Sequence, residues 1–338
     1  MKKDDKLVIY WLLTGCALIF IMVVVGGITR LTHSGLSISN YKLISGTIPP
    51  MNEIAWEKAF DLYKQYPEYK KINSHFTIDD FKSIYFWEWS HRVIGRMIGL
   101  VFIIPFLYFL IQRKLKKPTI KKSIILLFLG VFQGFLGWYM VKSGLVDRPD
   151  VSHYRLAAHL ITAFITFAYT LWVALDLIFQ EKKEINIRLR NIIGLGFAIL
   201  VVQIFWGALV AGLDAGFIHN HWPLMNEGTI MHETVLIEQI PLWKNFVHGK
   251  SGVQFVHRYL AYIVLGFIIY IWYKTKGMSL SRSQKIGVTS LLLLVFVQFI
   301  LGVFTLAYAV PVVLGVAHQV FAFFLLGSMT FVLHRFSR

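Results

Sequence analysis

The most constraining feature of this sequence is a series of apolar runs, each close to the length that crosses a lipid bilayer. A membrane-spanning helix needs about 20 predominantly apolar residues. Hydrophobic residues make up 56% of the chain and charged residues only 15%, whereas a soluble domain has about 25% charged residues. The sequence therefore predicts an all-α membrane protein and excludes a soluble enzyme. The eight predicted transmembrane helices cover residues 7–28, 92–112, 123–140, 156–178, 191–212, 259–273, 286–308 and 313–334.

The basic residues are concentrated on one side of these predicted spans. The two termini and three alternate connections hold 19 of the 34 Lys and Arg residues within 44 positions, whereas the opposite connections hold 14 within 129 positions. Because cytoplasmic loops are enriched in Lys and Arg, we expect a multi-pass protein of the cell inner membrane with both termini in the cytoplasm. The lipid bilayer thus accounts for the net charge of +16, and no nucleic-acid partner is inferred.

The two halves of the chain resemble each other. Residues 26–36 align with 207–217, and 88–92 align with 254–258. Parallel duplication is a known way of building membrane proteins. We therefore expect two tandem four-helix bundles of the same topology. Their boundaries are an N-terminal half at 1–178, a cytoplasmic linker at 179–190 and a C-terminal half at 191–338.

Local signals predict helices and helix contacts outside this repeat. An amphipathic helix is expected after Asn52, and Thr77 with Asp80 forms a variant capping box. From there one helix can continue through residues 87–91 into the second span. Glycines four residues apart permit close helix packing, and such pairs occur at Gly95/Gly99, Gly130/Gly134 and Gly212/Gly216.

Four of the twelve histidines lie near the outer ends of the even-numbered spans: His91, His159, His257 and His318. Each one taken alone fits an ordinary hydrogen-bonded interfacial residue. Four at equal depth, paired by the repeat, favour a functional role, because ionisable groups at membrane depth are costly. Two facing imidazoles without clustered cysteines or carboxylates suit an axially ligated haem better than zinc. The sequence therefore predicts two haem sites, His91/His159 and His257/His318.

The two predicted sites differ in one acidic residue. Glu88 precedes His91 by three residues on the same helical face, and its counterpart in the second half is Gln254. An acid beside only one site indicates chemistry there, although a solvated interfacial carboxylate is an equal alternative. Arg92 and Arg258 directly follow the paired histidines. They either bind haem propionates or anchor the helices at the membrane interface.

Taken together, these motifs resemble the haem A synthase family. Residues 30–37, 46–50 and 88–96 carry the resemblance in the first half, and 207–216 with 222–225 carry it in the second. They are most similar to the alpha-proteobacterial and mitochondrial branch. Another branch has paired cysteines in its outer loops, whereas the single cysteine here is Cys16. The resemblance implies an oxidoreductase that converts a porphyrin methyl group of haem O into a formyl group. The implied product is haem A for cytochrome oxidase, made by successive hydroxylations with water as the oxygen source.

The resemblance also implies roles for individual residues and partners. His257 and His318, with Arg258, would bind a haem b cofactor. His91 and His159, with Arg92, would bind the haem O substrate, and Glu88 would act as the acid–base residue. Haem O synthase (protohaem farnesyltransferase) would supply the substrate. The electron acceptor is not encoded in the sequence, and a homo-oligomer is left open.

Two other functions agree with parts of the pattern. A bis-histidine membrane cytochrome that exchanges electrons with quinone explains the four histidines but not the difference between Glu88 and Gln254. A non-enzymatic haem carrier or oxidase assembly factor would tolerate the loss of Glu88, whereas an enzyme would not.

Overall fold

The chain is almost entirely helical in the computed structural model, which describes residues 3–38, 45–144, 150–181, 185–226 and 228–337. Eight helices are long and apolar enough to cross a membrane, which confirms the predicted membrane class and the eight spans. No β-strand occurs within the described ranges. The long helices are α1 (Lys3–Leu31), α4 (Ile78–Ile111), α5 (Lys117–Gly144), α6 (His153–Ile178), α7 (Ile187–Gly212), α8 (Lys250–Thr275), α9 (Arg282–Ala307) and α10 (Val312–Phe336).

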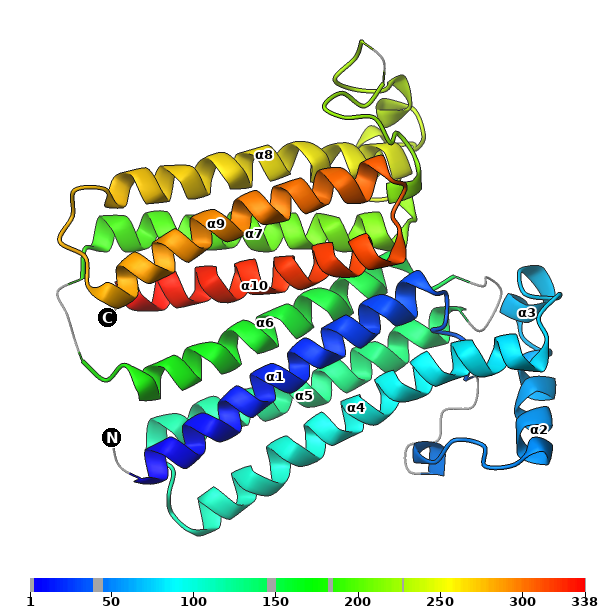
Figure 1. Cartoon of the computed structure of the whole chain (residues 1–338), viewed down its shortest axis with the longest axis horizontal. Helices are drawn as coiled ribbons and strands as arrows, with labels where there is room; N and C mark the ends of the chain where they lie inside the picture. Colours follow the sequence, from blue (N-terminus) through cyan, green and yellow to red (C-terminus); the bar gives the residue numbers. More distant parts are fainter. Residues whose placement is uncertain (1–2, 39–44, 145–149, 182–184, 227, 338) are drawn as a thin grey trace.

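The long helices lie side by side in two groups (Figure 1). One group contains α1, α4, α5 and α6, and the other contains α7, α8, α9 and α10. Helices α1 and α6 of the first group pack against α10 and α7 of the second. The N- and C-terminal ends both lie at one end of the helices, and the longer connections lie at the opposite end.

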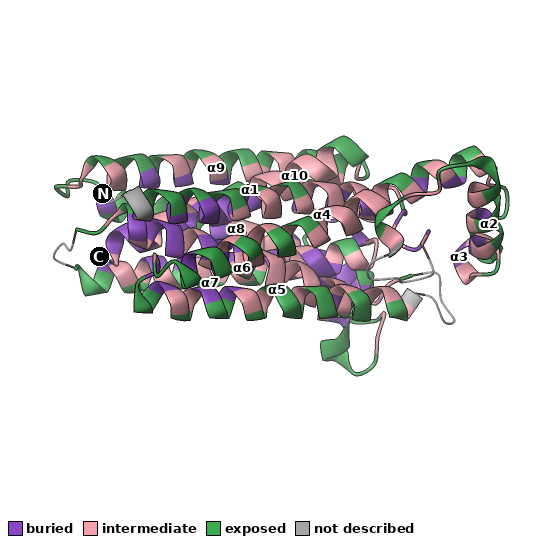
Figure 2. Ribbon diagram, turned by 90° about the horizontal axis from the view of Figure 1, so that it is seen from below, coloured by how far each residue is buried: buried purple, intermediate pink, exposed green. Residues whose placement is uncertain are grey.

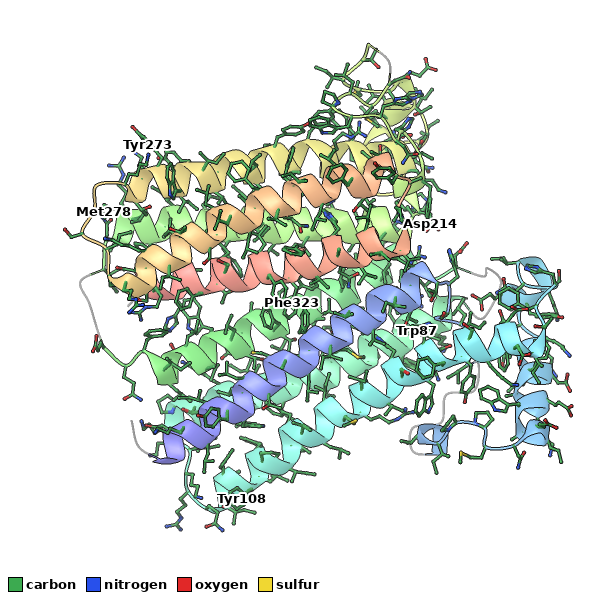
Figure 3. All side chains as sticks on the ribbon, in the orientation of Figure 1. Trp87, Tyr108, Asp214, Tyr273, Met278 and Phe323 are labelled. Carbon is green, nitrogen blue, oxygen red and sulfur yellow. The ribbon has the colours of Figure 1, made fainter. Side chains whose placement is uncertain are left out.

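The largest cluster of buried apolar residues contains residues of both groups, and a separate cluster lies within the first group alone (Figure 2 shows buried positions in purple). Phe164 and Phe167 of α6 pack on Phe323 of α10, with ring centroids 5.6 and 3.8 Å apart. Figure 3 shows Phe323 near the middle of the length of the helices, between α10 and α6. Because this packing crosses the boundary between the halves, it holds α6 and α10 at a defined depth relative to each other.

Polar contacts also join the halves at both ends of the helices. Arg30 of α1 donates to Asp214 Oδ1, just beyond α7, at 2.8 Å and to the backbone oxygen of Ala211 at 2.6 Å. At the opposite end, His334 Nε2 of α10 lies 3.0 Å from Asp176 Oδ1 of α6. Figure 3 shows that Asp214 lies at the same end as Trp87, and that Tyr108 and Met278 lie at the other.

The first long connection folds into two short helices, α2 (Glu53–Tyr63) and α3 (Pro67–Lys71), which extend away from the bundle (Figure 2). Asn52 caps α2, as predicted, by accepting a hydrogen bond from the Ala55 amide. The predicted capping box of Thr77 and Asp80 is also present, and it starts α4 well before the apolar span. Helix α4 then runs without a break past residues 88–91.

The second long connection contains short 3-10 turns in its described residues, at Ala215–Phe217 (η2), Glu233–Leu236 (η3) and Leu242–Phe246 (η4). A further turn, η1 (Ser45–Thr47), precedes α2. Part of the predicted linker at 179–190 lies outside the described residues, and the described part shows α6 ending at Ile178 and α7 beginning at Ile187.

Candidate functional site

The four selected histidines lie on α4, α6, α8 and α10, the second and fourth long helices of each half. His257 and His318 face each other with ring centroids 6.4 Å apart and ring planes at 88°. Two metal–imidazole bonds of about 2.0 Å, with about 1 Å from each nitrogen to its ring centre, span a similar distance. One iron atom therefore fits between these rings. His91 of α4 and His159 of α6 occupy the corresponding positions in the first half.

Each of these histidine rings rests on a glycine of the preceding long helix. A Cβ atom added at any of the four glycines would approach the Cε1 atom of the ring to 3.1 Å or less. Only glycine therefore leaves room for the imidazole at these places. The four contacts are Gly26–His91 at 3.0 Å, Gly137–His159 at 3.1 Å, Gly207–His257 at 2.8 Å and Gly302–His318 at 2.9 Å.

A cavity of about 280 Å³ opens beside His257 and His318. Gly207 and Gly302 contribute to its wall, and most of its other lining side chains are apolar. Ligand sites of this kind combine an apolar wall with a few polar groups that set the orientation. Imidazoles in an apolar cavity suit a flat, largely apolar ring system that carries a metal.

Arg258 lines this cavity and has unused hydrogen-bonding capacity. It is only 7% exposed, and its Nη2 donates to the backbone oxygens of His219 at 2.9 Å and His221 at 2.8 Å. Its Nε and Nη1 atoms are buried without a hydrogen-bond partner among the described residues. Because a buried cation is costly without an anion, Arg258 suits a carboxylate of a bound ligand. The donor set in this half thus fits an axially ligated haem with its propionates.

Glu88 is buried in the first half, with 3% of its surface exposed. Its Oε2 accepts hydrogen bonds from Ser37 Oγ and the Ile38 amide, both at 2.7 Å. Its Oε1 accepts from Arg92 Nη2 at 2.5 Å. The interpretation of Glu88 as a solvated interfacial carboxylate is therefore wrong, because residues following α1 fold back over it.

Arg92 uses its guanidinium within the protein. Besides Glu88, it donates to the backbone oxygen of Ile38 at 2.7 Å. Arg92 and Glu88 thus form a buried ion pair one helical turn apart, directly beside His91. Both arginines make polar contacts with the loops, and Arg258 has two guanidinium nitrogens without a partner among the residues described.

Gln254 occupies the place of Glu88 in the second half but makes the opposite kind of contact. Its Nε2 donates to the backbone oxygens of Ala215 at 2.9 Å and Ile218 at 2.5 Å. In both halves, the loop after the first long helix therefore wraps this side chain. The loop of the first half donates hydrogen bonds to the Glu88 carboxylate, whereas the loop of the second half accepts them from the Gln254 amide.

Sequence reasoning missed several residues of these sites. Ser37 and the Ile38 amide hold Glu88 from 50 or more positions away, and no local pattern indicates that contact. The four glycines that contact the histidine rings, here called the seat glycines, are Gly26, Gly137, Gly207 and Gly302. Their positions can be recognised in the sequence, because each lies on the long helix before its histidine. Of the predicted glycine pairs, Gly212 and Gly216 are closely packed, whereas added Cβ atoms at Gly99, Gly130 and Gly134 would have no neighbour within 4 Å.

Comparisons with known proteins cover nearly the whole chain. The family model described as "Cytochrome oxidase assembly protein" (COX15-CtaA) matches residues 9–330. A heme A synthase of Flavobacterium psychrophilum is 60% identical over 99% of this chain and 100% of its own length. One of Flavobacterium johnsoniae is 59% identical over 100% of both chains. One of Parvibaculum lavamentivorans is 42% identical over 97% of this chain and 94% of its own.

Proposed function

The chain belongs to the family of cytochrome oxidase assembly proteins, and from this premise we propose that it has the activity for which its relatives are named, heme A synthesis. A heme A synthase is an oxidoreductase that converts haem O to haem A for cytochrome oxidase. The reaction exchanges a porphyrin methyl group for a formyl group.

The observation that carries the proposal is the position of Glu88. Two histidine pairs lie in corresponding places of the two halves, and among the described residues a buried carboxylate lies beside one of them, His91/His159. An electron-transfer cytochrome needs no such difference. A site that removes protons from a substrate needs a base there, and a carboxylate is suited to this role.

In the C-terminal half, His257 and His318 would hold a haem b cofactor, and Arg258 would bind one of its propionates. The 6.4 Å separation of the rings and the free atoms of the guanidinium support this assignment. Such a haem supplies reversible one-electron acceptance. Most of the wall of this site is apolar, and the seat glycines Gly207 and Gly302 fix the depth of the two rings.

In the N-terminal half, His91 and His159 would hold the haem O substrate. Conversion of a methyl group to a formyl group with one water molecule releases four electrons and four protons in total. Glu88 would take these protons one at a time as carbon–oxygen bonds form. Its ion pair with Arg92 presents a carboxylate anion, and the bonds from Ser37 and Ile38 hold Oε2. The atom that would receive a proton is therefore Oε1, once Arg92 gives up its hydrogen bond to Oε1 and keeps the one to the Ile38 carbonyl.

The domain roles and the membrane placement follow as part of the same proposal. The half at 1–178 would contain the substrate site and the half at 191–338 the cofactor site. Both termini would face the cytoplasm of an inner membrane, because basic residues are concentrated on that side. Haem O synthase would supply the substrate, and the histidine pairs would lie near the outer surface.

The decisive test is pigment extraction from cells that express this chain together with a source of haem O. Haem A is expected in the extract, and cells with the empty vector should contain only haem O and haem B. Co-expression of the His91→Ala variant is the matched control and should also yield no haem A. If the intact chain binds haem but makes no haem A, the enzyme proposal fails. Reduction of the bound haem by quinol in that case would instead favour the cytochrome.

A further inference from the structure

Three of the four histidines share a second contact with the helix that carries their glycine seat. A glutamine stands one helical turn before the glycine, so that both residues lie on the same face. The pairs are Gln133 with Gly137 for His159, Gln203 with Gly207 for His257, and Gln298 with Gly302 for His318.

These glutamines bind their histidines directly. Gln133 Nε2 donates to the backbone oxygen of His159 at 2.9 Å, and Gln203 Nε2 donates to that of His257 at 3.0 Å. The Gln298 side-chain amide lies 3.3 Å from Nδ1 of His318. Each amide therefore ties the helix of the histidine to the neighbouring helix at the level of the imidazole. The Gln298 contact is made to the ring itself, whereas Gln133 and Gln203 hold the backbone from which the ring projects. Loss of an outer partner of a metal-binding imidazole typically changes metal affinity 10–100-fold.

His91 lacks this contact. The position one turn before its seat, Gly26, is Met22, whose thioether cannot donate a hydrogen bond. The methyl end of Met22 is directed at Gly95, one turn after His91, where an added Cβ would lie 3.3 Å from it. The Nδ1 atoms of His91 and His159 are both buried without a hydrogen-bond partner in the described part of the chain, so the two ligands differ in the glutamine contact and not at this ring nitrogen. Of the four histidines, His91 thus has the weakest support from outside its own helix.

The exception coincides with the other difference between the halves. His91 lies on α4 together with Glu88, the carboxylate that marks the proposed substrate site. A cofactor site keeps its haem, whereas a site that converts one haem into another must release it after every cycle. If both ligands were equally well supported, release would require breaking two firm bonds.

We propose that Met22 makes His91 the exchangeable ligand of the substrate haem, with His159 as the fixed ligand. This inference rests on the proposed function, because it assumes that the His91/His159 pair binds haem O and haem A. Release of the product would begin with loss of the bond to His91, while the bond to His159 would hold the haem until it is transferred. Met22 acts through His91 and is a positioning residue.

The test is the rate at which haem leaves the purified full-length protein, measured by transfer of haem A or haem O to excess apomyoglobin. The Met22→Gln variant installs the amide that the other three histidines have. Release from the N-terminal site should slow about 10–100-fold, while release from the C-terminal site should not change. In the matched reverse exchange, Gln203→Met should speed release from the C-terminal site by a similar factor. Met22→Leu, which adds no hydrogen-bonding group, should release haem at the rate of the unmodified protein.

The outcomes separate this inference from the proposed function. Unchanged release from Met22→Gln, with the haem still bound, overturns the role of Met22 whether or not the chain makes haem A. If Met22→Gln does not bind haem, Gln203→Met decides, and unchanged release from that variant overturns the inference. A chain that makes no haem A but shows both rate changes would refute the enzyme proposal and leave the ligand inference standing.

Discussion

Glu88 and Gln254 occupy corresponding places in the two halves, but their hydrogen bonds to the adjacent loop run in opposite directions. Glu88 accepts from the Ile38 amide at 2.7 Å, whereas Gln254 donates to the Ile218 carbonyl at 2.5 Å. Each loop has adapted to the group that it surrounds. Exchanging either side chain for the other therefore changes both the proton chemistry and the fit of a loop.

Replacing Glu88 with glutamine is expected to stop haem A formation while both histidine pairs still bind haem. Glutamine fills the same volume but cannot take a proton at neutral pH, and general base catalysis contributes about 10²–10⁴-fold. Pigment extraction and the haem-to-protein ratio measure the two effects. The Glu88→Asp variant keeps a carboxylate and should retain measurable activity. Undiminished haem A from Glu88→Gln would eliminate the acid–base role.

The same substitution removes the anion that pairs with Arg92. Loss of one partner of a buried ion pair costs roughly 3–5 kcal/mol, so Glu88→Gln should also lower the midpoint of thermal unfolding. The double variant with Arg92→Met removes the cation of the pair as well and should recover part of that stability without recovering activity. If the double variant regained activity, the loss of activity in Glu88→Gln would be due to the disturbed structure and not to the loss of a proton acceptor.

Replacing His257 or His318 with alanine should remove the low-spin haem b absorption of protein purified from cells without haem O. A lost axial ligand cannot be replaced by the apolar side chains that line this cavity. His153, which lies 3.2 Å from His248 at the outer end of α6, is a matched control. Its replacement by alanine should leave the spectrum unchanged. A normal spectrum in both His257→Ala and His318→Ala would show that the ligand assignment is wrong.

The sequence is sufficient to predict the elements of this fold whose causes are local. The apolar runs predict the eight spans, and the capping residues Asn52, Thr77 and Asp80 predict where α2 and α4 begin. The repeat predicts which histidines pair, and the facing rings of His257 and His318 agree with it. These features follow from residues a few positions apart or from the internal duplication.

The environment of Glu88 could not be predicted in this way, because it depends on a loop that is distant in sequence. Whether a carboxylate near a membrane surface is solvated or buried is decided by what folds over it, here Ser37 and Ile38. The close helix packing predicted from the spacing of Gly130 and Gly134 is also absent, since no neighbouring atom lies within 4 Å of a Cβ added at either glycine. Spacing alone does not tell which face of a helix has a neighbour.

Reporter fusions after Leu115 and after Ile230 should lie on opposite sides of the membrane. Leu115 lies between α4 and α5, and Ile230 lies between α7 and α8, so three spans separate them. The basic residues place the first on the cytoplasmic side. Paired alkaline phosphatase and fluorescent-protein fusions report the two sides independently. Fusions on the same side would contradict the eight-span topology and the depth of the histidines.

Alanine at Gly207 is expected to lower haem occupancy in the C-terminal half. The new methyl group would lie 2.8 Å from Cε1 of His257, so the ring must move. Overpacking of this kind costs about 1–3 kcal/mol. Gly130→Ala is the matched control, because its methyl group meets no neighbour and alanine favours a helix by up to about 1 kcal/mol. It should bind haem normally and unfold at the same or a higher temperature. Equal haem-to-protein ratios in the two variants would show that the contact between Gly207 and the His257 ring is not needed for haem binding.

The outer segment that contains α2 and α3 should become less stable as the pH rises, because of Glu68. This side chain is 5% exposed and accepts a hydrogen bond from the Tyr63 hydroxyl at 3.0 Å. Burial, with smaller contributions from the negative charges of Glu88 and Asp150, raises the pKa of Glu68 to about 8. The folded segment therefore binds more protons than the unfolded one between the ordinary glutamate pKa of about 4.3 and this raised value.

Its stabilising contribution is complete below the unfolded pKa and is lost as the pH rises through about 8. One pKa unit corresponds to about 1.4 kcal/mol, so the change across this range should amount to a few kcal/mol. Hydrogen exchange of residues 53–73 at pH 5 and pH 9, corrected for the intrinsic rate, measures it. Glu68→Gln stays neutral throughout and should remove most of the difference between the two pH values. A pH dependence equal to that of the unmodified protein would assign the effect to another group.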